Sequence, residues 1–364
     1  MQVSNEYSQA INIVKVLCMF GVVYIHASIV PYIDCSPAML YYQQLMTRVL
    51  PSFAVPGFFM CSGFLYFLNY HGIESYKRKS ISRLKSLIIP YLFWISFTLL
   101  ITWFLQDVLG LAHLFGAGHM KLIRNFTLND FFNSFWAVRD GAPFLSTMWF
   151  LRDLIVCMVL TPLFYLLLKG KYGRWALGVI LILSLTKLSF FHVGVSSIFW
   201  FSFGAFVAIN NIDVFTKIKT QKKILIAMGG MLVLAYCMVY TENREIGLQS
   251  YFISILQMLT TLVLFSNTLL LSMILVGRKW GYRLAKLGTP SYFIYLAHEP
   301  YMGYILQLFI KSVSLLSSSF LFFGFVSITP IVFPFIIILM CLVIFKIMRK
   351  YCPKVLSFMV GGKV

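Results

Sequence analysis

Long apolar segments alternate with short polar ones along almost the whole chain. Most of them approach or exceed the run of about 20 apolar residues with which a helix crosses a bilayer. The pattern predicts an all-α polytopic membrane protein with about ten transmembrane helices, folded as a single domain over residues 1–364 with its transmembrane core at about residues 12–346. The fifth and sixth segments are short, and only His192 and Val193 separate them. The ten segments cover residues 12–32, 50–70, 86–106, 147–168, 175–191, 194–211, 224–240, 250–275, 287–310 and 319–346.

The composition agrees with this pattern and excludes a water-soluble domain. Of the 364 residues, 60% are hydrophobic and only 11% are charged, and the mean hydropathy is +0.85. A soluble domain of this length has no need for so much apolar surface. Membrane lipids are therefore the first partner that the sequence predicts.

Basic residues are concentrated in every second loop. If the N-terminus is cytoplasmic, 21 of the 30 Lys and Arg residues lie in inner loops and the C-terminal tail, 7 lie on the outer side, and Lys15 and Arg152 lie within the membrane. Cytoplasmic loops of membrane proteins carry this excess, so the bias favours ten helices with both termini in the cytoplasm. It also explains the net charge of +19 through anionic lipid headgroups, without a nucleic-acid partner.

Only one predicted loop is long, an outer one at about residues 107–146. Its second half contains Phe131, Phe132, Phe135 and Trp136. These aromatic side chains predict either an amphipathic helix at the membrane surface, where such residues are common, or a stacking platform for a sugar. The sequence leaves both interpretations open.

A few ionisable residues lie inside the apolar segments, where they are costly and therefore mark candidate functional sites. Lys15 and His26 are eleven residues apart, so a helix places them on one face and about 16 Å apart along its axis. His26 and Asp153 lie at a similar depth below the outer surface if the first segment runs outward and the fourth inward. Because a carboxylate level with an imidazole can orient it and stabilise the imidazolium, we predict that Asp153 supports His26 as a catalytic pair.

Each of these residues also has a structural interpretation. His26 could be a hydrogen-bonded packing residue, and Lys15 could extend its ammonium group to the inner headgroups. Arg152 could form a buried ion pair with the aspartate that follows it. His298 and Glu299 could satisfy backbone groups that Pro300 frees in its helix.

A further basic pair, Arg83 and Lys85, lies where the third apolar segment begins. Basic residues at this boundary are ordinary on the cytoplasmic side. Their closeness to the lipid boundary also suits them to bind a phosphate-bearing ligand. We therefore predict a phosphate site at the inner end of this segment.

Five motifs give the chain a family resemblance. They are NIVKVLCMFGVVYIHA in the first segment, VPGFFMCSGFLYF in the second, YKRKSISRLKSLIIPYLFW entering the third, MWFLRDL opening the fourth and SYFIYLAHEP in the ninth. With these motifs in this order and ten predicted helices, the chain resembles the acyltransferase 3 family of integral membrane acyltransferases, which modify bacterial surface glycans and related acceptors. The resemblance covers most of the chain.

The resemblance implies an O-acyltransferase of the bacterial inner membrane. It implies transfer of an acyl group, commonly acetyl, from cytoplasmic acyl-CoA to a hydroxyl of a cell-surface glycan or a lipid-linked saccharide, with no other cofactor. His26 matches the family's essential histidine, while Lys15 stands where the family has an arginine. Arg83 and Lys85 match a pair of arginines in the family. Lysine keeps the charge but lacks the planar fork with which arginine binds phosphate bidentately.

The predicted geometry suits this donor. A ligand with phosphates at Lys15, Arg83 and Lys85 and a thioester at His26 needs a thin arm of about 16 Å, as pantetheine provides. In this interpretation His26 deprotonates the acceptor hydroxyl or carries the acyl group transiently, and Asp153 orients it. The remaining ionisable residues are expected to line the cavity, and they are Arg152, His298 and Glu299.

Two other functions fit the same residues. A transporter or flippase for a lipid-linked saccharide would use the intramembrane histidine and aspartate as a proton relay and would consume no acyl-CoA. A structural membrane subunit would use the polar residues only for packing, and His26→Ala would then lower its abundance. The histidines are too scattered to predict a metal site, and the sequence leaves a homo-oligomer open.

Overall fold

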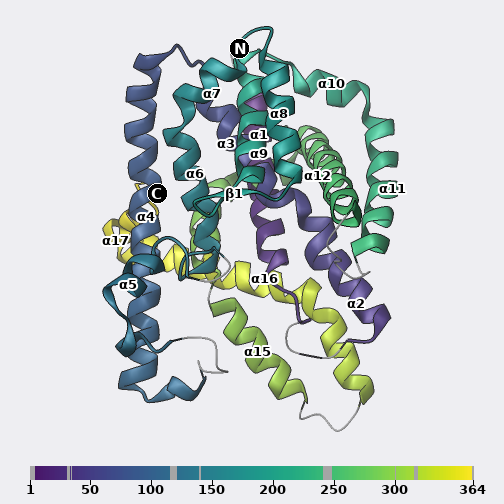
Figure 1. The fold of residues 1–364 in the computed structure, drawn as a ribbon. Helices are drawn as coiled ribbons and strands as arrows, with labels where there is room; N and C mark the ends of the chain where they lie inside the picture. The colour runs from purple at the N-terminus through teal and green to yellow at the C-terminus, as the bar shows by residue number, and fades with distance from the viewer. Residues whose placement is uncertain are drawn as a thin grey trace.

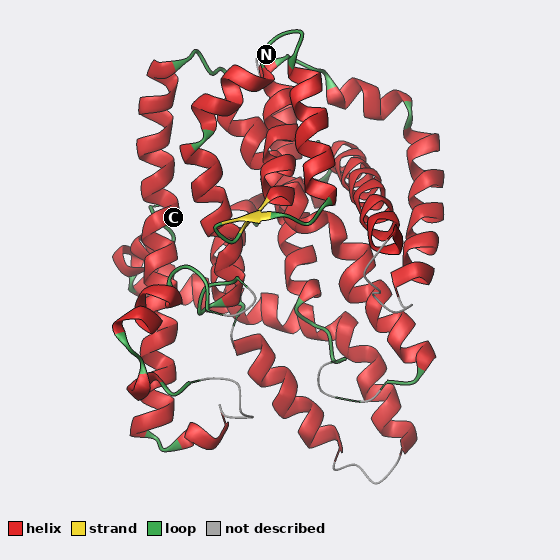
Figure 2. Ribbon diagram, in the orientation of Figure 1, coloured by secondary structure: helices red, strands yellow, loops and turns green. Residues whose placement is uncertain are grey.

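The structure is a computed structural model in which residues 5–30, 33, 35–114, 121–138, 141–240, 248–299, 301–314 and 319–362 are described. Figure 1 shows a bundle of long helices, most of them running roughly side by side, and Figure 2 shows how little of the chain forms strands. The prediction of a helical polytopic membrane protein is therefore confirmed in its main feature.

The seventeen α-helices of the described residues are α1 Asn5–Ile25, α2 Pro37–Gln44, α3 Ala54–Phe67, α4 Ile73–Trp103, α5 Leu128–Ser134, α6 Trp149–Val159, α7 Thr161–Leu168, α8 Gly173–Leu185, α9 Val195–Ile209, α10 Val214–Thr220, α11 Lys222–Tyr240, α12 Leu248–Leu275, α13 Lys279–Lys286, α14 Gly288–Ala297, α15 Tyr301–Ser314, α16 Ser319–Tyr351 and α17 Pro353–Met359. Short helical turns of other types are η1 Leu45–Val49, η2 Leu50–Phe53, η3 Phe104–Val108, η4 Leu111–Leu114, η5 Ile123–Asn125 and η6 Ser146–Met148. The strands are β1 Ser189–Phe190 and β2 Val193–Gly194.

Six helical segments of the described chain are long and apolar enough to cross a membrane. The number rises to eight if each of two bent pairs counts as one span. One bent pair is α6 with α7, which meet at 62° where Pro162 opens α7, and the other is α9 with α10, which meet at 99°. The shorter helix α8 and the pair α14 and α15 coincide with the remaining predicted segments.

Helix α1 lies at the centre of the bundle and contacts α3, α12, α14 and α16. It begins earlier than the apolar pattern indicates, because Tyr7 stacks on Phe215 with ring centroids 4.4 Å apart. It also ends earlier, at Ile25, after which His26 and Ala27 form a tighter turn with carbonyls three residues back. His26 therefore lies at the C-terminal end of the helix, where the helix dipole favours a positive charge.

Two glycines allow α3 and α9 to pack backbone against backbone. A Cβ added to Gly63 would lie 2.1 Å from the Phe201 carbonyl oxygen, and one added to Gly204 would lie 2.0 Å from the Met60 carbonyl oxygen. No residue with a Cβ fits at either position, because the atoms that it would meet belong to the main chain and cannot move aside as a flexible side chain can.

Gly63→Ala should therefore destabilise the protein, because α3 and α9 must separate. Overpacking of this kind costs about 1–3 kcal/mol, so the Tm in detergent is expected to fall. Gly178→Ala in α8 is the matched control, since nothing lies within 4 Å of the added carbon. An unchanged Tm for the Gly63 variant would show that this helix contact is looser than the structure indicates.

A β-hairpin joins α8 to α9 and was not predicted. Phe190 pairs with Val193 and Ser189 with Gly194, while Phe191 and His192 at the tip have φ of 49° and 68°. Positive φ at both central residues is the geometry of the tightest hairpin turns. The hairpin lies between helices α8 and α9, which correspond to the fifth and sixth predicted segments.

The outer loop contains α5, whose first turn is capped by Thr127 and Asp130 in a reciprocal capping box. The Lys121 ammonium group and the Thr127 hydrogen bonds lower the pKa of the Asp130 carboxyl group to about 2. Phe132 is 75% exposed and Phe131 48% exposed. This agrees with an interfacial helix in the described part of the loop, and residues 115–120 and 139–140 of the predicted loop lie outside the described residues.

Candidate functional site

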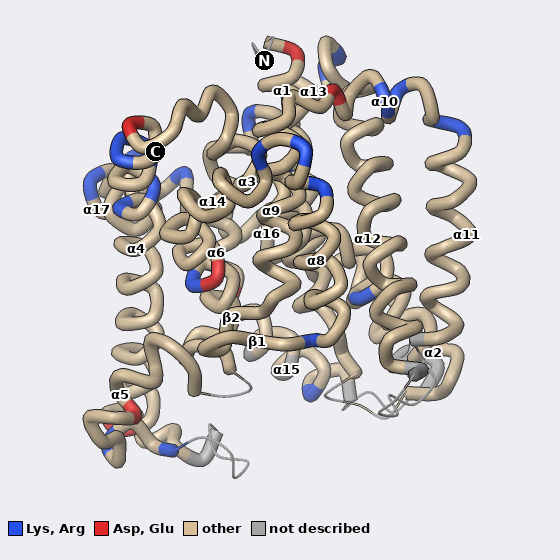
Figure 3. Tube along the Cα trace, turned by 45° about the horizontal axis from the view of Figure 1, so that its top comes forward, with Lys and Arg blue, Asp and Glu red and all other residues tan. Residues whose placement is uncertain are grey.

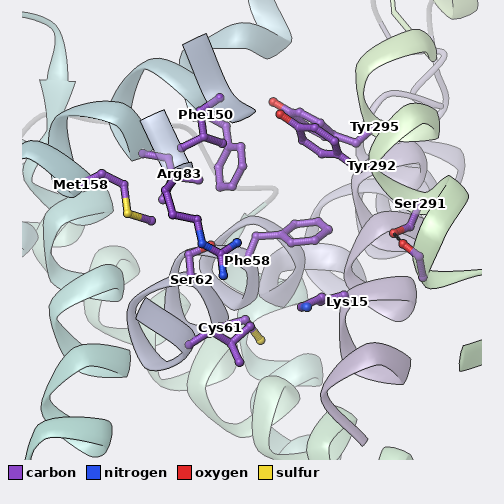
Figure 4. Close-up of a pocket in the computed structure, with 14 residues that line it drawn as sticks. Lys15, Phe58, Cys61, Ser62, Arg83, Phe150, Met158, Ser291, Tyr292 and Tyr295 are labelled. Atoms are coloured by element: carbon purple, nitrogen blue, oxygen red, sulfur yellow. Dashed lines mark hydrogen bonds between the residues drawn. The ribbon is translucent and has the colours of Figure 1, made fainter. Parts of the chain in front are cut away.

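A cavity of about 230 Å³ lies between α1, α3, α4, α6 and α14, and we call it the lysine cavity. Lys15 and Arg83 line it together with Phe150, Tyr292 and Tyr295. Figure 4 shows the two basic side chains reaching toward the same space, with the tyrosine rings on the far side of it. The structure thus brings together two of the three predicted donor-binding residues.

Lys85 does not belong to this cavity. It is exposed and lies outside the cavity lining, although Arg83 is only two residues away. Two helical residues correspond to about 200° of rotation, so a continuous α4 turns the two side chains to opposite faces. The prediction of one phosphate clamp from both residues is corrected accordingly.

His26 lies beside Glu299 and His298. Its Nδ1 atom is 3.4 Å from the Glu299 Oε1 atom, and the rings of His26 and His298 meet edge to face with centroids 5.1 Å apart. The His26 side chain is 30% exposed and that of Glu299 is 15% exposed. The carboxylate that contacts the imidazole is therefore that of Glu299, and not that of Asp153, which the sequence predicted to orient His26.

His298 is fully enclosed behind this pair. Its Nδ1 atom lies 2.7 Å from the Tyr295 carbonyl oxygen, so the neutral ring donates its proton there and leaves Nε2 as an acceptor. Among the described residues, Nε2 has no hydrogen-bond partner. Because Tyr295 also lines the lysine cavity, His298 connects that cavity to His26. Pro300, which the sequence linked to this pair, lies outside the described residues.

Asp153 is instead part of a closed ion pair with Arg152. The Asp153 Oδ1 atom accepts hydrogen bonds from the Arg152 guanidinium group at 2.9 and 3.1 Å, and Oδ2 accepts one from the Ser197 hydroxyl at 2.7 Å. Both residues are buried. The structural interpretation of this pair is thus the one that the contacts support.

A second cavity, of about 600 Å³, opens beside the β-hairpin, and we call it the hairpin cavity. Ile25, which precedes His26, lines it, as do Asp153 and Trp149. Aromatic rings separate it from the lysine cavity: Phe59 lines the hairpin cavity, Phe150 lines the lysine cavity, and their ring centroids are 4.7 Å apart.

Arg48 is a site residue that the apolar pattern does not reveal. The pattern places Arg48 on the outer side, before a second apolar segment that is expected to begin near residue 50. The structure extends this helical segment to Pro37–Phe67, and Arg48 lines the hairpin cavity from the π-helical turn η1. Such π turns often occur at functional sites.

The arrangement suits group transfer between two ligands that arrive from different sides. The lysine cavity offers cations for an anionic ligand, the hairpin cavity offers aromatic and polar groups, and His26 lies where the elements of both cavities meet. The described residues contain no group of three His, Cys, Asp or Glu that could hold a metal ion.

Comparisons with known proteins point in one direction. The model of a protein family described as an acyltransferase domain matches residues 8–349. The chain is also similar to the succinoglycan biosynthesis protein ExoH of Rhizobium meliloti (strain 1021), with 24% identity over 98% of this chain and 92% of that protein. No solved structure matches the chain.

Proposed function

This chain belongs to the acyltransferase family that its residues 8–349 match, and from that premise we propose that it moves an acyl group from cytoplasmic acyl-CoA to a saccharide hydroxyl. Acetyl-CoA is the expected donor, and a cell-surface glycan or lipid-linked saccharide is the expected acceptor. The observation that carries the proposal is the His26–Glu299 pair, which ring contacts through His298 and Tyr295 connect to the lysine cavity and which Ile25 connects to the hairpin cavity.

We place the protein in the bacterial inner membrane with ten crossing segments and both termini in the cytoplasm. The two bent pairs, α8, and α14 with α15 bring the six long spans to ten. Figure 3 supports this orientation, since most Lys and Arg residues gather at the end of the bundle near the N-terminus. Such enrichment is typical of the cytoplasmic side.

Donor binding is assigned to the lysine cavity. Phosphate oxygens of acyl-CoA contact Lys15 and Arg83, and the pantetheine arm follows the cavity past Phe150 toward Tyr295. The ring of Tyr295 contacts that of His298, whose ring contacts that of His26. The thioester then lies near the imidazole.

The transfer itself needs one base. The neutral His26 imidazole accepts the proton of the acceptor hydroxyl while the hydroxyl oxygen attacks the thioester carbonyl carbon. The C–S bond breaks, and the CoA thiolate takes the proton from the imidazolium, so charge and atoms balance. Glu299 stabilises the imidazolium between these steps. In the alternative route an imidazole nitrogen of His26 attacks the thioester carbonyl carbon and the C–S bond breaks, which releases the CoA thiolate. The acceptor hydroxyl then attacks the acyl-histidine, the C–N bond breaks, and the hydroxyl proton passes to the thiolate.

The assignment predicts a donor-binding defect when Arg83 is replaced. Arg83→Gln should raise the KM for acetyl-CoA about 10–100-fold, because a charge-assisted hydrogen bond contributes about 1.5–3 kcal/mol. The measurement is release of free CoA by purified protein in detergent over a range of acetyl-CoA concentrations. Arg78→Gln, an exposed residue of the same helix, is the matched control.

The same experiment separates the enzyme from a transporter. A flippase for a lipid-linked saccharide would neither bind acetyl-CoA nor release CoA, and Arg83→Gln would then behave like Arg78→Gln. An increase in KM for both variants would instead indicate a diffuse attraction to the basic surface and would contradict a specific phosphate contact.

A further inference from the structure

An unpaired arginine lies in a membrane-spanning segment. Arg48 belongs to the continuous helical segment Pro37–Phe67, and within the described part of the chain it forms no ion pair or side-chain hydrogen bond. Its charge acts electrostatically on His26. Arg48 is exposed and lines the hairpin cavity, so its guanidinium group is open to an anionic ligand there.

The other charges of the hairpin cavity are already compensated. Arg152 and Asp153 form a closed ion pair, and the guanidinium group of Arg152 also donates to the carbonyl oxygens of Trp136, Gly141 and His192. Among the described lining residues, Arg48 is therefore the charge without a counter-ion. The cavity as a whole carries a positive charge.

The remaining lining suits a sugar. Trp149 and Trp200 supply aromatic faces, and Gln257 and Ser196 supply hydrogen-bonding groups. A cavity of about 600 Å³ falls within the range of about 300–1,000 Å³ that is usual for small-molecule sites. The phosphates of the donor are assigned to Lys15 and Arg83 in the lysine cavity, which leaves this cation for the other reactant.

We propose that the acceptor is an anionic saccharide and that Arg48 binds its oxyanion in the hairpin cavity, which rests on the proposed acyltransferase function. A carboxylate of a uronic acid and a phosphate ester of a sugar share this chemistry, since both offer oxygens that accept two parallel hydrogen bonds from a guanidinium group. Arg48 is thus a specificity residue, which selects the acceptor by its charge and holds its hydroxyl groups near His26.

The test compares neutral and anionic sugars as acceptors. Purified protein with acetyl-CoA is given the matched sets glucose, glucuronate and glucose 1-phosphate, and galactose, galacturonate and galactose 1-phosphate, and the acceptor-dependent release of CoA is measured. Wild type is expected to show a kcat/KM at least about tenfold higher for an anionic member than for its neutral sugar. Acceleration by uronates identifies a carboxylate, and acceleration by the 1-phosphates identifies a phosphate.

In the variant Arg48→Gln, the ratio of kcat/KM for an anionic sugar to kcat/KM for its neutral counterpart should fall to about one. Arg124→Gln, which removes an exposed arginine 3.6 Å from Asp107, should retain it. The inference is overturned if wild type releases CoA without preferring anionic sugars, or if the preference survives in Arg48→Gln. It is also overturned if Arg48 binds a charged acyl group instead of the acceptor. In that case Arg48→Gln would impair transfer from the CoA thioester of a dicarboxylic acid and would leave the preference among sugars unchanged. Failure of wild type to release CoA at all would instead reject the proposed function and, with it, this inference.

Discussion

Replacing His26 by alanine should abolish acyl transfer while the protein remains folded. The substitution removes the base that accepts the hydroxyl proton, and loss of a general base typically costs about 10²–10⁴ in rate. The His26 side chain is 30% exposed and lies after the last residue of α1, so its removal interrupts no helix. CoA release from acetyl-CoA is the measurement, with Tm as the check on folding.

Two further variants make this test decisive. His71→Ala removes an exposed histidine between α3 and α4 and should leave the rate unchanged. His26→Gln keeps a polar side chain of similar size and should be as inactive as His26→Ala, since an amide cannot accept the proton. Substantial activity in either His26 variant would contradict the proposed base, and loss of folding in both would favour the packing interpretation of this residue.

The apolar pattern predicts the helical segments well because membrane burial depends on length and hydropathy. Each of the ten predicted segments overlaps a helix or a bent pair of helices. The boundaries differ where tertiary contacts add turns outside the lipid, as the stacking of Tyr7 on Phe215 does for α1. The hairpin at residues 189–194 was missed because two paired residues on each side are too few to show an alternating pattern.

The residues that belong to the site were easier to predict from the sequence than the contacts between their side chains. Helical rise gives the depth of a residue in the membrane but not the direction in which its side chain points. The apolar pattern predicts a similar depth for Asp153 and His26, but the Asp153 oxygens contact Arg152 and Ser197, and the carboxylate beside His26 is that of Glu299. The separation of Arg83 from Lys85, by contrast, follows from helical rotation alone and could have been predicted.

The buried ion pair of Arg152 and Asp153 stabilises the wall of the hairpin cavity. Arg152 is 3% exposed, and its guanidinium group bonds to Asp153 and to main-chain carbonyls of the outer loop and of the hairpin. Asp153 in turn accepts hydrogen bonds from Ser197 in α9 and from the Gly194 amide in β2. One residue pair thus joins α6, α9, the hairpin and the outer loop.

Arg152→Leu should therefore be among the most destabilising single substitutions. It leaves the Asp153 carboxylate buried without a counter-charge, and breaking a buried pair in this way costs about 3–5 kcal/mol. We expect a marked fall in the Tm of the protein in detergent. The exposed pair of Arg124 and Asp107 gives the comparison, since Arg124→Gln should cost no more than about 1 kcal/mol.

The double variant Arg152→Leu with Asp153→Leu distinguishes an ion-pair effect from a loss of packing. Removing both charges also removes the uncompensated carboxylate, so the double variant should be more stable than Arg152→Leu alone. It still lacks the donors to the carbonyl oxygens of Trp136, Gly141 and His192, so recovery should be partial. Equal Tm values for the single and double variants would mean that these carbonyl bonds, and not the charge of Asp153, account for the stability of this wall of the cavity.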